Sequence, residues 1–122
     1  MVSKRHLVAA VMAAGLFAAI PACDIESIDQ HPCPQGGTTL TFENFGRGFF
    51  SAYCNSCHSA DNGNRNGAPD TYAFDTIEEI QRHKERIFVR SADNNNSMPP
   101  GPDDPPLAER QKLGDWLACG AP

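Results

Sequence analysis

Residues 54–58 of the chain read Cys-Asn-Ser-Cys-His, two cysteines separated by two residues with a histidine directly after the second. This spacing is the attachment signature of a c-type haem. On one short helical turn both thiols can add to the vinyl groups on one edge of a porphyrin, while the histidine binds the iron from one side. Cys54, Cys57 and His58 are therefore candidate haem-binding residues, with His58 as an iron ligand.

Two other interpretations of the Cys-x-x-Cys pair need different surroundings. A structural zinc site needs a second pair of ligands, and a thioredoxin-like dithiol needs a strand–helix–strand pattern around it. Neither context is evident in the 122 residues. Haem attachment is the favoured interpretation, with a redox dithiol and a metal site as alternatives.

The first 22 residues read as a signal peptide. Lys4 and Arg5 precede an apolar run over residues 7–20, and its fourteen residues are too few to span a bilayer comfortably. The run leads into Ile-Pro-Ala-Cys at residues 20–23, which resembles a bacterial lipobox with an unusual proline. We expect export, cleavage before Cys23 and lipid attachment to its thiol. Ordinary cleavage nearby, which would leave a soluble periplasmic protein, is the alternative.

The five cysteines divide among three expected roles. Cys23 takes lipid and the pair at 54 and 57 takes haem, which leaves Cys33 and Cys119. In a small exported domain we expect these two to form a disulfide that joins the ends of the domain, with separate free thiols as the alternative. The chain-entropy argument gives such a bond a stabilisation on the order of 4 kcal/mol, less any strain.

Charge and composition define the rest of the organisation. After loss of residues 1–22, eight Lys and Arg against 15 Asp and Glu give a net charge of −7, and no basic patch is available to bind nucleic acid. Residues 23–37, rich in Pro, Gly and acidic side chains, are expected to be a tether between anchor and domain. Residues 38–122 then form one small domain, whose hydrophobic core alone would be marginal.

Helical patterns predominate and no convincing strand alternation appears, so the predicted fold class is all-α. Apolar side chains recur at helical spacing over about residues 42–55, a segment that leads into the Cys-x-x-Cys-His motif. A second helix is expected from a capping-box pattern at Thr76 and Glu79 to about residue 90. A third is expected after residue 104, with four apolar side chains on one side: Leu107, Leu113, Trp116 and Leu117.

Two irregular segments, residues 59–74 and 91–104, separate these three helices. Both are rich in Asn, Asp, Gly and Pro. Loops of this length in so small a domain are usually functional or wrapped around something. We expect them to enclose one covalently bound haem.

From about residue 42 to 122 the chain resembles a class I monohaem cytochrome c. That family has a first helix ending in Cys-x-x-Cys-His, a loop that carries an axial methionine, and a last helix packed across the first. Met98, forty residues after His58 and followed by two prolines, matches the position of the family's distal ligand. A lone methionine can be core filler, but Met98 lies in a polar, Pro-rich segment with no apolar stripe to join. The resemblance implies His58 and Met98 as axial ligands of one haem c.

Two further matches accompany the resemblance. Gly46 and Phe50, with Leu113 and Trp116, have the spacing by which the family crosses its terminal helices, and the glycine would let the backbones approach closely. Pro69 matches the position of a proline whose carbonyl accepts the free N–H of the ligand histidine, although it can equally be a turn former. The resemblance thus implies an orienting role for Pro69 beside the haem.

Other polar residues are weaker candidates. His31 and His83 are alternatives to Met98 as the second iron ligand, and His83 is expected to be exposed because it lies among charged residues. Asp61 and its neighbours hint at a calcium loop, but Tyr72 stands where the bidentate glutamate should be. We expect a solvated loop there.

The resemblance implies an exported one-electron carrier, tethered to a membrane as a lipoprotein, that is not itself an enzyme and has no small-molecule substrate. Its acidic charge predicts a redox protein partner with a basic docking face. Two alternatives differ in class. One is an electron-accepting subunit of a larger oxidoreductase, and the other is a haem-based sensor or small-molecule binder in which Met98 is not a firm ligand.

Overall fold

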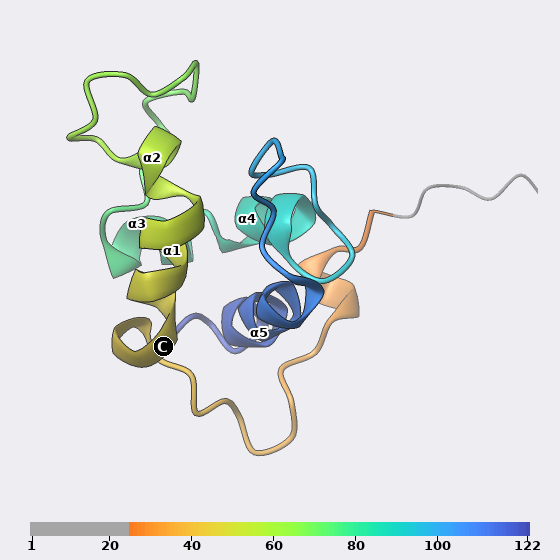
Figure 1. The fold of residues 1–122 in the computed structure, drawn as a ribbon. Helices are drawn as coiled ribbons and strands as arrows, with labels where there is room; N and C mark the ends of the chain where they lie inside the picture. Colours follow the sequence, from red (N-terminus) through yellow and green to blue (C-terminus); the bar gives the residue numbers. More distant parts are fainter. Residues whose placement is uncertain (1–24) are drawn as a thin grey trace, which may run out of the picture.

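The computed structural model describes residues 25–122, in which every regular element is helical and no strand occurs (Figure 1). The all-α prediction is confirmed for this range, and none of its helices is long and apolar enough to cross a membrane. The expected signal peptide and the expected lipidation site at Cys23 lie outside this range. The elements are the 3₁₀ turn η1 (Ile28–Gln30), the π-helical turn η2 (Phe42–Gly46), and the α-helices α1 (Arg47–Tyr53), α2 (Asn55–His58), α3 (Ile77–Arg82), α4 (Lys84–Ser91) and α5 (Leu107–Ala118).

The first expected helix is divided into three pieces. It begins as η2, which Thr41 caps by accepting a hydrogen bond from the Asn44 N–H while the Asn44 side chain accepts one from the Thr41 N–H. The Gly46 N–H donates to the Thr41 carbonyl, 3.1 Å away, which closes the wider π-type turn. α1 then runs to Tyr53, and Cys54 separates it from the single turn α2. The segment is helical as predicted, but it is not one continuous helix.

The second expected helix is divided as well. Its capping box is confirmed, since the Thr76 hydroxyl accepts the Glu79 N–H at 3.3 Å and the Glu79 carboxylate accepts the Thr76 N–H at 3.0 Å. The helix breaks at His83, whose ring packs against Tyr72 and Phe74 at centroid separations of 5.0 and 6.2 Å. His83 is half-buried, so the expectation that it is exposed is wrong. Aromatic packing outweighs the effect of its charged neighbours in the sequence.

The third expected helix, α5, begins at Leu107 directly after Pro106. Three of its four apolar residues are fully buried as expected: Leu113, Trp116 and Leu117. Leu107 is 46% exposed, so its predicted place on the same side is wrong. At 3.6 residues per turn, position 107 points about 120–130° away from the centre of the face that the other three share.

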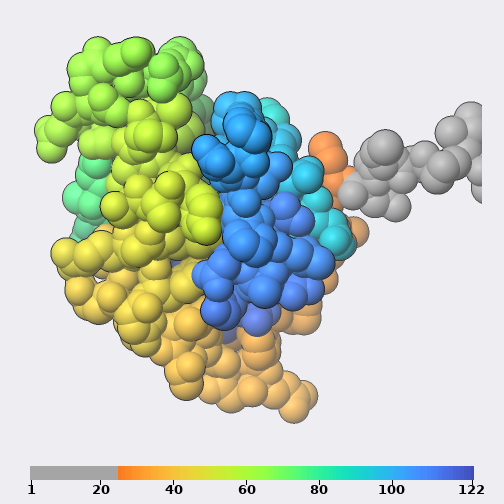
Figure 2. Space-filling model, in the orientation of Figure 1, coloured from red at the N-terminus to blue at the C-terminus, as the bar shows by residue number. Residues whose placement is uncertain are grey.

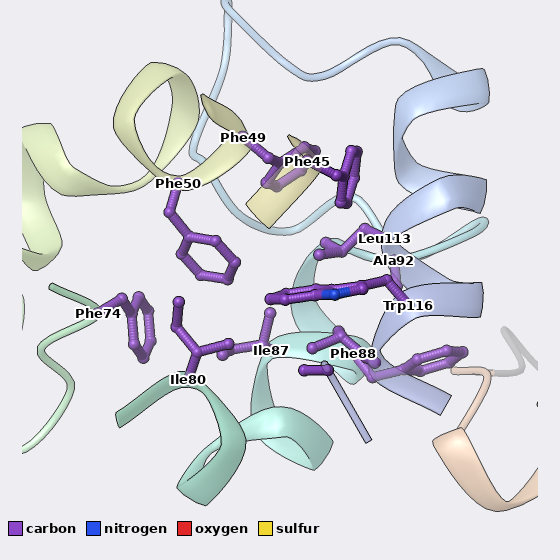
Figure 3. Packing of buried hydrophobic residues seen from close by; sticks show 12 residues of the cluster. Phe45, Phe49, Phe50, Phe74, Ile80, Ile87, Phe88, Ala92, Leu113 and Trp116 are labelled. Atoms are coloured by element: carbon purple, nitrogen blue, oxygen red, sulfur yellow. The ribbon is translucent and has the colours of Figure 1, made fainter. Parts of the chain in front are cut away.

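The core gathers around Trp116, whose side chain is fully buried (Figure 3). The rings of Phe45 and Phe50 lie near it, with centroid separations of 5.9 and 6.3 Å. The indole N–H donates to the Pro122 carbonyl at 3.2 Å, so the one polar atom of the ring is paired. A Cβ on Gly46 would lie only 2.7 Å from the Trp116 ring. At Gly46 the close approach is therefore between the backbone of the first helical segment and the Trp116 ring, and not between two helix backbones.

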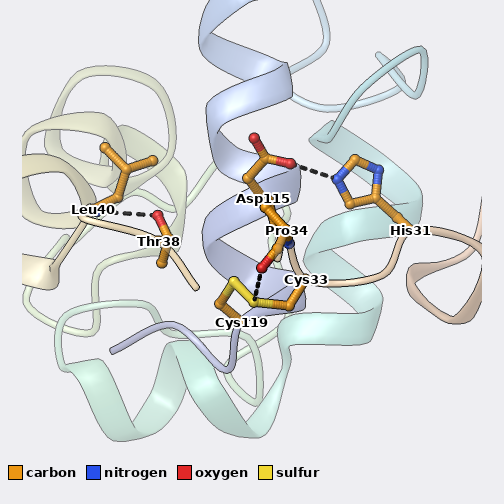
Figure 4. Close-up of a disulfide and its surroundings, with 7 residues drawn as sticks. All are labelled: His31, Cys33, Pro34, Thr38, Leu40, Asp115 and Cys119. Atoms are coloured by element: carbon orange, nitrogen blue, oxygen red, sulfur yellow. Dashed lines mark hydrogen bonds and ion pairs between the residues drawn. A yellow bond between two sulfur atoms is a disulfide. The ribbon is translucent and has the colours of Figure 1, made fainter. Parts of the chain in front are cut away.

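The two ends of the domain are joined. Cys33 and Cys119 form a disulfide, as expected, with their Cα atoms 4.7 Å apart (Figure 4). The Phe42 N–H donates to the Pro122 carbonyl at 2.8 Å, so the last residue of the chain lies beside the start of η2 (Figure 1). The N-terminal and C-terminal segments therefore close on each other at two places.

The segment expected to be a tether, residues 23–37, is folded over its middle part. η1 contacts both α4 and α5. His31 lies between the carboxylates of Asp93 and Asp115, 2.8 Å from each. The prediction of a linker is therefore wrong for residues 28–33. Composition could not reveal this, because one histidine and one cysteine hold a stretch that is otherwise polar and rich in proline.

Substitution of Gly46 by alanine should lower the free energy of unfolding by about 1–3 kcal/mol, because the added methyl group collides with a fully buried indole that cannot move aside. Gly48, in α1, has nothing within 4 Å of the position of a Cβ. Gly48→Ala is therefore the matched control, and its better helix propensity should stabilise the protein by about 0.5–1 kcal/mol. Urea unfolding followed by far-ultraviolet circular dichroism measures both. Equal effects of the two changes would contradict the packing described at Trp116.

Candidate functional site

The Cys-x-x-Cys-His motif lies on one turn at the end of α1. The N–H groups of Cys57 and His58 both donate to the Cys54 carbonyl, at 3.0 and 2.9 Å, which closes the turn. Cys54 and Cys57 are the two cysteines in residues 25–122 that are not in the disulfide. All three motif side chains line the same pocket. The predicted short helical turn is therefore present.

The pocket lies between the motif and the loop that follows α4. Its volume of about 290 Å³ is near the lower end of the roughly 300–1,000 Å³ of small-molecule and cofactor sites. In Figure 2 the loop after α2, in green, and the loop after α4, in blue, form separate lobes of the surface. The motif and the loop after α2 form one side: Tyr53, Cys54, Ser56, Cys57, His58, Arg65, Asn66, Gly67, Ala68, Pro69, Tyr72 and Phe74. α4 and the loop after it form the other: Arg86, Ile87, Arg90, Ser91, Met98, Pro99 and Pro100.

Met98 lies on the side of the pocket that α4 and the loop after it form. Its N–H donates to the Arg90 carbonyl at 2.9 Å, which holds the loop against the end of α4. Met98 is 38% exposed, one of three large apolar residues with such exposure in the described part of the chain. The structure thus brings His58 and Met98, which are forty residues apart, to one pocket. His31 and His83 do not line it.

The ring of His58 is fixed by one hydrogen bond and one stacking contact. Its Nδ1 lies 2.8 Å from the Tyr72 carbonyl, and the ring stacks on Phe74 at a centroid separation of 4.7 Å and an interplanar angle of 24°. Because a carbonyl can only accept, Nδ1 carries the proton and Nε2 keeps its lone pair for a metal. The imidazole therefore has the tautomer that an iron ligand needs.

The carbonyl that orients His58 belongs to Tyr72 and not to Pro69, so the role implied for Pro69 is wrong. The Pro69 carbonyl instead accepts the Tyr72 N–H at 3.0 Å and closes the turn in between. Pro69 still lines the pocket. The turn-forming role that the sequence also allowed is the one that the structure has.

Arg65 is a site residue that sequence reasoning missed. Its Nε donates to the Cys57 carbonyl at 3.2 Å, and its Nη2 donates to the Tyr72 carbonyl at 3.0 Å. A third bond, from Nη1 to the Asp70 carboxylate, measures 3.0 Å, and only 12% of the Arg65 side chain is exposed. One guanidinium thus binds both the motif and the carbonyl that orients His58. The signal in the sequence was a single cation inside a polar, Asn-rich loop.

The pocket is apolar with a positive rim. Three guanidinium groups line it, from Arg65, Arg86 and Arg90, and none of the lining residues is acidic. Arg86 and Arg90 are one turn apart on α4. Guanidinium groups bind carboxylates through paired hydrogen bonds. The pocket therefore suits an apolar ligand that carries carboxylates.

The Cys54 thiol is kept in its neutral form. Burial, together with a smaller effect of the neighbouring Cys57, raises its pKa to about 12. The Asn66 side-chain amide donates to the Cys57 sulfur at 3.3 Å. At neutral pH Cys54 thus keeps the S–H proton that addition of a thiol across a vinyl group consumes.

The described part of the chain does not show a second metal site of the kind that the sequence suggested around Asp61. Within residues 25–122 no three side chains of His, Cys, Asp or Glu gather as a metal site would need. Cys33 and Cys119 are bonded to each other outside the pocket.

No protein-family model, no curated protein and no solved structure matches this chain.

Substitution of Arg65 by leucine should lower the free energy of unfolding by about 1.5–3 kcal/mol, because two carbonyls lose a charged donor. Arg82, exposed on α3, forms no ion pair in the described part of the chain. Arg82→Leu is the control and should change stability by less than about 0.5 kcal/mol. Denaturant unfolding of the two variants side by side tests this. If Arg65→Leu were as stable as Arg82→Leu, Arg65 would not hold the loop around His58.

Proposed function

We propose that this protein is an exported one-electron carrier with a single c-type haem, built on the fold of a class I cytochrome c. Cys54 and Cys57 would hold the haem covalently, with His58 and Met98 as its two axial ligands. The observation that carries the proposal is that these four residues line one pocket, although Met98 comes from a different loop. The spacing of the Cys-x-x-Cys-His motif supplies the chemistry of attachment.

Three features of the pocket fit a haem: the residues that could attach it, the apolar wall and the arginines. The thiols of Cys54 and Cys57 are unpaired on one turn, and the Nε2 atom of His58 is free to bind a metal. The pocket wall offers aromatic and aliphatic surface to an apolar ring system. Arg86 and Arg90 would bind the two carboxylates that the haem carries. A zinc site or a redox dithiol would have no use for Met98 or for these arginines.

A haem bound here would supply the Fe(II)/Fe(III) couple for one-electron transfer. The chain's own residues prepare its surroundings. The Tyr72 carbonyl and Phe74 hold His58 in one orientation, so the ligand does not have to reorganise. A thioether such as that of Met98 favours ferrous iron and raises the reduction potential. With both axial positions filled, no site would be left for oxygen or peroxide.

The same proposal includes the location and the partner. The disulfide between Cys33 and Cys119 supports an oxidising compartment outside the bacterial cytoplasm. Lipid attachment at Cys23 would tether the protein to a membrane. A redox protein with a basic docking face would suit its net negative charge. An electron-accepting subunit of a larger oxidoreductase would use the same site in the same way.

Covalent haem is tested by producing the chain together with haem-maturation machinery and staining a denaturing gel for haem. The wild type should stain, and the Cys54→Ser, Cys57→Ser double variant should lose the stain completely because no thioether can form. Cys33→Ser is the matched control, since it also removes a thiol but leaves the motif intact, and it should keep the stain. A wild-type protein without stain would reject the proposal.

The second ligand is tested by the near-infrared spectrum of the ferric protein. The wild type should show the band of charge transfer from methionine sulfur to iron, and Met98→Ala should lose it while retaining the covalent haem. Leu107→Ala, which removes another exposed apolar side chain, should keep the band. A wild type that lacks the band and binds carbon monoxide readily in its ferrous form would instead favour a sensor or small-molecule binder.

A further inference from the structure

The N-terminal segment around η1 is attached to the loop that carries Met98. The Asn94 side chain donates to the Glu26 carboxylate at 2.9 Å, and the Asn95 side chain donates to the Glu26 backbone carbonyl at 2.9 Å. Asn95 also donates to the Phe88 carbonyl at the end of α4, 3.1 Å away. The first residues of the loop are therefore held from both sides, a few positions before Met98.

His31 makes a further attachment of the same segment. Its Nδ1 lies 2.8 Å from Asp93 Oδ2, and its Nε2 lies 2.8 Å from Asp115 Oδ1 (Figure 4 shows the second contact). The contact with Asp115 is a hydrogen bond, whereas the contact with Asp93 has the distance of an ion pair without hydrogen-bond geometry, so Asp93 Oδ2 is a buried oxygen without a hydrogen-bond donor in the described part of the chain. The ring also packs against Phe88 at a centroid separation of 5.4 Å. A positive charge on this ring would attract both carboxylates, one on α5 and one on the loop.

Asp93 needs such a partner. It is a buried residue in the left-handed region, with a φ of 51°, and its Oδ2 would lie 2.6 Å from a Cβ on Gly114. Arg110 approaches only its backbone, where Nε donates to the Asp93 carbonyl at 2.9 Å. Burial raises the pKa of Asp93, the charge of His31 lowers it, and the charges of Glu26 and Asp115 raise it further. The pKa of this carboxyl is raised overall, and His31 is the neighbouring group that lowers it where the chain leaves α4.

We infer that His31, in its protonated form, is a positioning residue for Met98: it fixes Asp93 and thereby the loop that presents the thioether to the pocket. This inference rests on the proposed function, because it takes Met98 as the second iron ligand. The charged groups around His31 are Asp93 on the loop, Asp115 and Arg110 on α5, and Glu26 on the N-terminal segment. α4 contributes the uncharged ring of Phe88.

A neutral His31 would no longer attract the Asp93 carboxylate, and the loop should loosen. Met98 would then leave the iron more easily, and an external ligand would compete with it more successfully. Carbon monoxide is a suitable probe because it does not titrate. The apparent affinity of the ferrous protein for carbon monoxide therefore reports how often Met98 is displaced.

The experiment compares this affinity from about pH 5 to pH 8 in the haem-loaded wild type and in His31→Phe. The wild type should bind carbon monoxide about tenfold more tightly at the upper end than at the lower end. His31→Phe, which keeps a ring against Phe88 but carries no charge, should bind tightly at every pH. A merely structural role would raise the affinity without removing its pH dependence.

Two further variants make the test decisive. Asp115→Asn changes a half-exposed side chain that should not affect folding. It should reduce the pH dependence because it removes the charge of the carboxylate that is hydrogen-bonded to His31. Asp29→Asn, an exposed change in η1, should behave like the wild type. If the wild type has a haem stain and the methionine band but His31→Phe and Asp115→Asn both keep its pH profile, the inference about His31 fails alone. If the wild type has no stain, the proposed function fails with it.

Discussion

The packing of Trp116 against the start of the first helical region is the contact on which the rest of the structure depends. The indole touches the bare backbone of Gly46, and its N–H binds the Pro122 carbonyl. That carbonyl also accepts the Phe42 N–H. Since α2 and the Cys-x-x-Cys-His turn continue from α1, the contact at Trp116 also sets where His58 lies relative to α4 and the loop after it.

Much of the fold could be predicted from the sequence, because helices and caps leave local signals. The Thr76 capping box and the buried face of α5 follow from spacing alone, and the disulfide follows from the cysteine count. The break at His83 could not be predicted, since it comes from packing on Tyr72 and Phe74 in the loop directly before α3. The attachment of His31 also depends on two carboxylates that are far away in the chain.

The parts of the candidate site that consist of side chains could be predicted from the sequence. The part that consists of a backbone carbonyl could not. Cys54, Cys57, His58 and Met98 are distinctive residue types in a distinctive spacing, and all four line the pocket. The carbonyl that orients His58 has no signature in the sequence, because every residue has one. The path of the loop decides that it is the carbonyl of Tyr72, and Arg65 helps to set that path by donating to the same oxygen.

The disulfide between Cys33 and Cys119 has a consequence for proteolysis. The loop after α2 is largely exposed and rich in asparagine and glycine, the kind of segment in which proteases cut first. One cut there would separate the Cys-x-x-Cys-His motif from Met98 along the backbone. The two fragments would nevertheless stay in one covalent molecule, because each contains one of the two bonded cysteines. A nicked chain would therefore keep both walls of its pocket together until the disulfide is reduced.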